Sequence, residues 1–264
     1  MAYQRAIADH QGWYADPTIR RIGTPDVFDV LAKGVADFNE KPSHLMFLTL
    51  IYPIVILFLA RLTFGYDVLP LLFPLAAGFA LLGPVAAIGL YELSRRREQG
   101  QEIAWRHAFG VLKSPSLGAI IRLALILVAI FVLWLLTAYA IYRTLFGDVM
   151  PASIGGFANQ VFHTREGWAL IIVGNAVGFL FALAVLTISV VSFPLLLDRN
   201  VGAGRAMSTS IRAVLANPVP MLLWGLIVAV GLLVGSIPLF VGLCVVLPVL
   251  GHATWHLYRK VVAW

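Results

Sequence analysis

Long apolar runs alternate with polar segments along this chain of 264 residues. A helix needs roughly 20 apolar residues to cross the hydrocarbon core of a bilayer, which is about 30 Å thick. Six runs reach or approach this length, and the last two are separated only by GSIP, in which Gly235 and Pro238 favour a break. We therefore predict six membrane-spanning helices, over about Leu45–Ala60, Val68–Tyr91, Leu117–Tyr142, Trp168–Leu197, Val219–Val234 and Pro238–Tyr258.

The composition agrees with this pattern. Hydrophobic residues make up 60% of the chain and charged residues only 12%, whereas a soluble domain carries about 25% charged residues. A water-exposed surface cannot be built from so few charges, so most of the chain must face lipid. The predicted fold class is an all-α, polytopic membrane protein.

The basic residues indicate how the chain is threaded. If the N-terminus is cytoplasmic, sixteen of the 19 lysine and arginine residues fall on the cytoplasmic side of the six spans. Loops rich in Lys and Arg stay in the cytoplasm, so both termini are expected there. The same residues predict contact with anionic lipid head groups on the cytoplasmic side rather than with nucleic acid.

The segment before the first span contains a candidate surface helix. Residues 1–43 form a predicted cytoplasmic segment, and residues 44–264 form the transmembrane domain. Within the first segment, TPDVFDVLAKGVADFNEK has helical amphipathicity, and Asp37 is expected on its polar side. We predict an interfacial amphipathic helix whose apolar stripe consists of Val27, Leu31, Val35 and Phe38.

Two predicted cytoplasmic loops follow the same plan. RREQGQEIAWRHAFGVLKSPS comes after the second span and DRNVGAGRAMSTSIRAVLANPVP after the fourth, and Gly100 aligns with Gly202. Each loop has an amphipathic stretch that ends just before the proline opening the next span. This order predicts an internal parallel repeat over about 68–142 and 168–234. The alternative is that any short amphipathic loop on the inner leaflet has this pattern.

Polar side chains collect near the cytoplasmic ends of the spans. His252 and His256 stand one helical turn apart, and Glu92, Arg122 and Asp198 lie at a similar depth. Buried polar groups in membranes pair with one another, so we predict a polar inner layer in which His252 contacts Glu92, Arg122 or Asp198. The alternative is that His252 and His256 bind haem or a metal, which only their spacing favours. We expect no cofactor and no metal.

The fourth span carries a strongly polar residue in its outer half. Asn175 lies between Gly174 and Gly178, and small residues at this spacing let membrane helices approach closely. We predict a helix-packing seam with an interhelical hydrogen bond. The alternative is a substrate contact in a transport path, to which Thr187, Ser189 and Ser192 would contribute.

Three segments carry a resemblance to a known family: LLFPLAAGFALLGPVAAIGLYELSRRREQG, VVSFPLLLDRNVGAGRAMSTSIRAVLANP and VLPVLGHATWHLYRK. Together they resemble the bacterial integral membrane family called domain of unknown function 2189, over nearly all of the chain from Thr24 onward. The resemblance implies a multi-pass protein of six helices in the bacterial inner membrane. It implies no activity.

Three functions fit the sequence, in decreasing order. The first is a non-catalytic accessory, scaffold or assembly subunit of a larger membrane complex, such as a respiratory one, with other membrane proteins as partners. The second is a small-solute transporter or channel. The third is a haem- or metal-binding redox protein. No Walker loop, nucleophile elbow or paired catalytic carboxylates occur in the sequence, so an enzyme is not expected.

Overall fold

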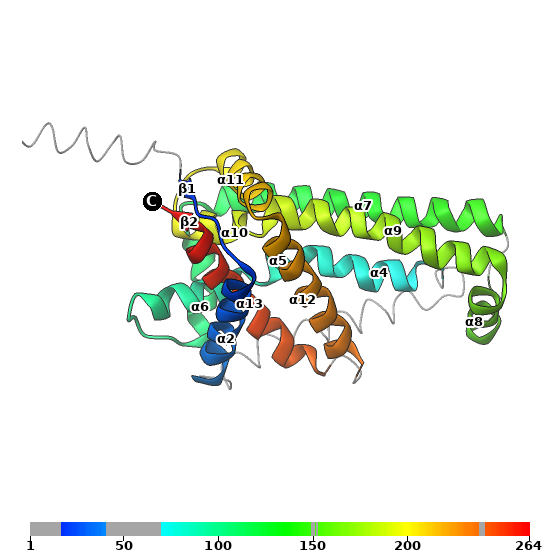
Figure 1. Ribbon diagram of the computed structural model, residues 1–264, viewed down its shortest axis with the longest axis horizontal. Helices are drawn as coiled ribbons and strands as arrows, with labels where there is room; N and C mark the ends of the chain where they lie inside the picture. Colours follow the sequence, from blue (N-terminus) through cyan, green and yellow to red (C-terminus); the bar gives the residue numbers. More distant parts are fainter. Residues whose placement is uncertain (1–16, 41–69, 149–150, 152, 238–240) are drawn as a thin grey trace, which may run out of the picture.

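The computed structural model describes residues 17–40, 70–148, 151, 153–237 and 241–264, so the predicted first span, Leu45–Ala60, lies outside the described residues. The described part is mostly helical (Figure 1). Its elements, in chain order, are β1 Thr18–Ile19, α2 Thr24–Glu40, α4 Leu72–Phe79, η2 Ala80–Leu82, α5 Gly83–Ala86, α6 Ile88–Glu98, η3 Trp105–Lys113, α7 Leu117–Phe146, α8 Ile154–His163, α9 Arg165–Ser189, α10 Ser192–Asp198, α11 Ala203–Ala216, α12 Pro218–Ser236, α13 Leu243–Val261 and β2 Val262–Ala263.

Four helical stretches of the described residues are long and apolar enough to cross a bilayer: Phe73–Glu98, Leu117–Phe146, Arg165–Asp198 and Pro218–Ser236. They coincide with the second to fifth predicted spans. The break between the last two predicted spans is confirmed, because α12 ends at Ser236 and α13 begins at Leu243. Helix α13 is not among the four stretches. Its second half is polar and buried against other helices, so the sixth span stays a prediction.

Helices α7 and α9 lie side by side and extend away from the other helices, with α4 next to α7 (Figure 1). We call α4, α7 and α9 the arm. Buried Trp134 of α7 holds the three together: its indole N–H donates to the Pro74 carbonyl of α4 at 2.8 Å. A Cβ added to Gly78 would lie 2.5 Å from this ring, and one on Gly178 of α9 3.1 Å from it. Both glycines therefore admit the indole.

The opposite end of the molecule is built around α13, which packs against α2 along much of its length and also against α6 (Figure 1). We call α2, α6 and α13 the hub. The closest approach is at Gly34 of α2, where an added Cβ would lie 2.6 Å from the Val249 carbonyl oxygen and 2.7 Å from the Ala253 Cβ. Only glycine allows the two helices to touch here.

The predicted helix in the N-terminal segment is confirmed, but its predicted apolar stripe is wrong. The buried face of α2 consists of Val27, Val30, Gly34 and Asp37. Val35, expected in the stripe, is 40% exposed, and Asp37, expected on the polar side, is buried. The physical reason is that α2 packs on α13 through its smallest residue, which turns a neighbouring face inward.

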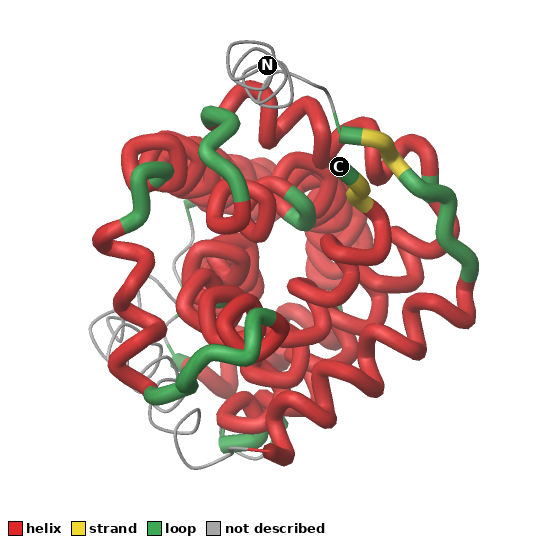
Figure 2. The backbone as a smooth tube through the Cα atoms, turned by 90° about the vertical axis from the view of Figure 1, so that its left-hand side faces the viewer, coloured by secondary structure: helices red, strands yellow, loops and turns green. Residues whose placement is uncertain are grey.

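The two ends of the described chain meet. Strands β1 and β2 pair antiparallel, with Thr18 opposite Ala263, and both lie at the hub end (Figure 2). Buried Asn217 fixes the adjoining segment, because its side-chain oxygen accepts from Ile22 N at 2.7 Å and its amide donates to Arg20 O at 3.1 Å. This pairing supports termini on one side of the membrane, and the cytoplasmic orientation stays a prediction.

The two aligned loops share a backbone feature. Gly100 and Gly202 both have positive φ, 66° and 81°, a conformation that glycine adopts without steric cost. Each precedes a helical segment that leads to a proline and the next long helix, but the first segment, η3, is a 3-10 helix and the second, α11, is an α-helix. The equivalent glycines agree with an internal repeat, which stays a prediction.

Candidate functional site

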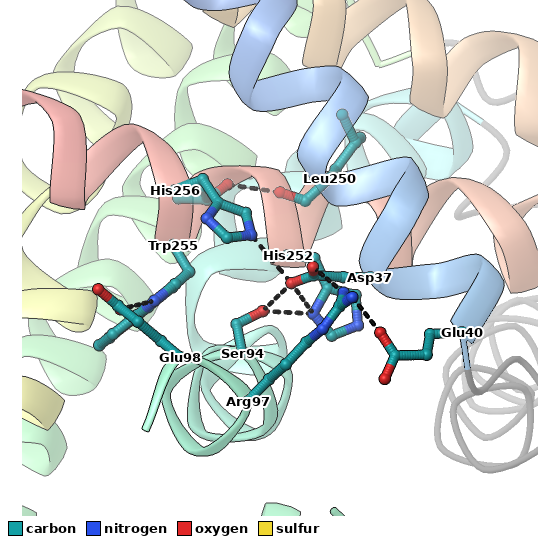
Figure 3. Close-up of polar contacts among 10 residues, drawn as sticks. Asp37, Glu40, Ser94, Arg97, Glu98, Leu250, His252, Trp255 and His256 are labelled. Carbon is teal, nitrogen blue, oxygen red and sulfur yellow. Dashed lines mark hydrogen bonds and ion pairs between the residues drawn. The ribbon is translucent and has the colours of Figure 1, made fainter. Parts of the chain in front are cut away.

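The hub encloses a buried carboxylate, Asp37, which three helices surround (Figure 3). Its Oδ2 accepts from the Ser94 hydroxyl of α6 at 3.0 Å and lies 2.9 Å from His256 Nε2 of α13. Arg97 of α6 forms ion pairs with both Asp37 and Glu40. We call Asp37, Ser94, Arg97, His252 and His256 the Asp37 cluster.

His252 joins the cluster through the serine. Its Nδ1 lies 2.5 Å from Ser94 Oγ and 3.7 Å from Asp37 Oδ2. A hydroxyl has one hydrogen, and Ser94 donates it to Asp37. His252 Nδ1 must therefore donate to Ser94 Oγ. Nε2 of His252 is buried and has no hydrogen-bond partner among the described residues, which suits the unprotonated nitrogen of a neutral ring.

The environment of Asp37 favours its charged form. Burial by itself raises the pKa of the Asp37 carboxyl, because it disfavours charge. The hydrogen bond from His256, with the charges of the histidines and Arg97, outweighs burial and lowers the pKa below its ordinary value. The cluster is therefore a charged hydrogen-bond network between α2, α6 and α13.

The residue types of a hydrolase triad are present, but their order differs. In such a triad the imidazole lies between the serine and the carboxylate. Here Ser94 lies between His252 and Asp37 and is only 2% exposed, so the ring is not placed to activate the serine against a substrate. No group of three or more His, Cys, Asp or Glu among the described residues could hold a metal ion. The geometry suits a structural lock.

The predicted partners of His252 lie elsewhere. Buried Glu92 pairs with Arg95 at 2.8 Å and Arg96 at 2.9 Å. Asp198 accepts from the Tyr258 hydroxyl at 2.7 Å, and the side chain of Arg122 is exposed. Ser94 and Asp37 take the place of the predicted partners. Sequence reasoning missed Asp37, although the spacing of Val27, Val30, Gly34 and Asp37 along α2 is itself a helical stripe.

The predicted seam on α9 is only partly occupied. Gly178 contacts Trp134 of the arm, whereas a Cβ on Gly174 would meet no described atom within 4 Å. The side chain of Asn175 is exposed, and its amide donates to the Ile171 carbonyl of its own helix at 2.7 Å. The hydrogen bond printed by the geometry is thus within α9 and not the interhelical bond that the sequence predicted.

Four long apolar helical stretches, joined to a polar hub at one end, define a helical integral membrane protein. Residues 72–198 match the family model described as "Predicted integral membrane protein (DUF2189)", and over these residues the chain belongs to that family. The resemblance seen in the sequence is thereby confirmed. The match includes Ser94 and Arg97 and leaves Asp37, His252 and His256 outside. Comparison with curated proteins and with solved structures finds no match.

Proposed function

We propose that this protein is a non-catalytic accessory, scaffold or assembly subunit of a larger membrane complex in the bacterial inner membrane, with both termini in the cytoplasm. A respiratory complex is one such assembly. The observation that carries the proposal is the exposed Asn175 beside the open Gly174 on the apolar surface of α9.

Much of the α9 surface has no partner among the described residues. Only 6% of the apolar stretch within Arg165–Asp198 is buried, against 28% for the stretch in α7. Lipid can cover the leucine and phenylalanine side chains there, but an amide in hydrocarbon is costly unless it is paired. Gly174 leaves room for a second helix at the same place. A helix of another membrane protein would supply both contact and hydrogen bond.

The polar side chains proposed for a transport path support this ranking. Thr187, Ser189 and Ser192 each donate to a carbonyl one turn earlier in the chain. Their hydroxyls are therefore satisfied locally and offer a passing solute little. The order of Ser94, His252 and Asp37 likewise supports a non-catalytic role, with the cluster holding α2 in place.

The proposal is tested by purifying the tagged protein from its native membrane in mild detergent and identifying stoichiometric partners. We expect a partner with wild type that is lost with Asn175→Leu. The matched control is Thr137→Val, which changes an exposed residue on α7 whose hydroxyl also bonds to its own helix, at Leu133 O. This control should keep the partner.

Two results would contradict the proposal. If Asn175→Leu retains the partner as well as Thr137→Val does, the α9 surface is not the contact. If the wild-type protein purifies without a partner, the transporter becomes the leading function. A haem absorption band that survives removal of partners would instead favour the redox function.

A further inference from the structure

A polar pocket of about 300 Å³ opens where α6, η3, α7 and α10 meet. Its size is at the lower end for ligand pockets, which suits a head group and not a whole lipid. Four basic and two acidic side chains line it, together with Ser114 and Ser116; the charged ones are Arg95, Arg96, Lys113, Arg199, Glu92 and Asp198.

Both carboxylates of the pocket are already engaged. Glu92, which is 2% exposed, holds Arg95 and Arg96 through two N–H groups of the first and one of the second. A guanidinium carries five N–H donors, so these contacts leave both arginines able to bind a further anion. Asp198 accepts from Tyr258 and lies 3.6 Å from Arg259, which is outside the pocket.

The remaining cations lie at the rim. Lys113 ends η3 and is exposed, and Arg199 follows α10 and stacks over the Trp264 ring at 5.3 Å from its centroid. Helix α7 begins at Leu117, directly after the lining residue Ser116. The positive end of its helix dipole adds to the field of the cations. The pocket therefore attracts a small, multiply charged anion.

The position of the pocket narrows the chemistry of that anion. Three of the four candidate spans have an end here: Phe73–Glu98 and Arg165–Asp198 finish beside the pocket, and Leu117–Phe146 starts there. The ends of membrane spans lie at the level of the lipid phosphates. Arginine forks match phosphate oxygens in geometry as well as in charge.

We propose that this pocket binds a phosphate group carried by an anionic lipid head group or by a soluble phosphate compound. Glu92 orients the Arg95 and Arg96 guanidiniums at the base, and Lys113 and Arg199 close over the phosphate from the rim. The site goes beyond the proposed function, because it does not depend on the α9 surface and can be tested independently of any partner protein.

The test compares binding of cardiolipin, phosphatidylglycerol and phosphatidylcholine to the delipidated full chain in detergent, by native mass spectrometry. The pocket variant is Lys113→Gln/Arg199→Gln, which leaves Glu92 paired. The control is Lys33→Gln/Arg106→Gln, which removes two exposed positive charges outside the pocket. We expect the pocket variant to bind the anionic lipids about tenfold more weakly than the control does.

A competition arm with inorganic pyrophosphate separates the two sources. If pyrophosphate displaces the lipid from wild type and control, the phosphate group alone suffices and a soluble ligand is supported. If it does not, the lipid head group is the ligand. Equal binding by pocket and control variants, or equal binding of phosphatidylcholine, overturns the proposal. The charge-keeping variant Lys113→Arg/Arg199→Lys must retain binding, which separates lost charge from a folding defect.

Discussion

The hub and the arm use polar side chains in opposite ways. In the hub, Asp37 joins residues of α2, α6 and α13 through contacts that span 57 to 219 positions of sequence. In the arm, Thr137, Thr144 and Asn175 are exposed and donate to carbonyls of their own helices. The hub therefore depends on specific pairs between helices, whereas the arm satisfies its polar groups locally and presents apolar side chains outward.

This difference separates two sources of stability. The hub has a buried polar network and a helix contact that only glycine permits, so single substitutions there should loosen the whole packing. The arm relies on the bilayer, and on the contact we propose at Asn175, so substitutions there should change association more than folding. The following predictions test this contrast.

The largest effect is expected for Asp37→Ala. It removes the acceptor shared by Ser94 and His256 and leaves Arg97 with Glu40 alone. Breaking a buried charged network costs about 3–5 kcal/mol, and the partial exposure of Arg97 places this variant near the lower limit. Unfolding in a titration of sodium dodecyl sulfate measures the change. A loss as small as that of an arm variant would remove the distinction between the regions.

Gly34→Ala should come next. Its new methyl group would overlap the backbone of α13 at Val249 O, and overpacking of this kind costs about 1–3 kcal/mol. The matched control is Gly204→Ala in α11, where an added Cβ meets no described atom within 4 Å. The control should be neutral or slightly stabilising because alanine favours a helix. Equal unfolding midpoints for both variants would show that α2 does not pack on α13 as described.

A smaller effect is expected from acid. The folded-state pKa of Asp37 is lowered, so its contribution to stability is complete above the unfolded value of about 3.9 and is lost as the pH falls through the folded value. A nitroxide on Phe28→Cys, an exposed position of α2, should become more mobile below about pH 4 by electron paramagnetic resonance. Asp37→Asn should abolish most of this pH dependence; an unchanged profile would assign it to other groups.

The smallest effect is expected for Thr137→Val in the arm. The hydroxyl bonds only to Leu133 O in the described structure, and an apolar replacement of similar shape suits a lipid-facing position. The unfolding midpoint in the same detergent titration should shift by less than about 0.5 kcal/mol equivalent. A loss comparable to that of Gly34→Ala would mean that polar groups of the arm also stabilise tertiary contacts.

The apolar runs predicted most of what the helices are, because a stretch such as Leu117–Tyr142 has one stable arrangement in a bilayer. They could not predict which face of α2 is buried. The stripes through Val35 and through Gly34 are both helical, and the choice depends on where α13 lies. The partners of Asp37 were equally hidden, since Ser94 and His256 reach it only through the tertiary fold. The phosphate pocket likewise joins residues of separate loops.

The central claim is that the Asn175 surface of α9 contacts another membrane protein. It is tested most directly by a photo-crosslinking amino acid placed at Asn175 in native membranes. Val173 is the control position, because it is exposed, only two residues away and about 200° around the helix. We predict one discrete crosslink to another membrane protein at position 175 and none at 173. Crosslinking to lipid alone, to the chain itself, or equally from both positions would contradict the account.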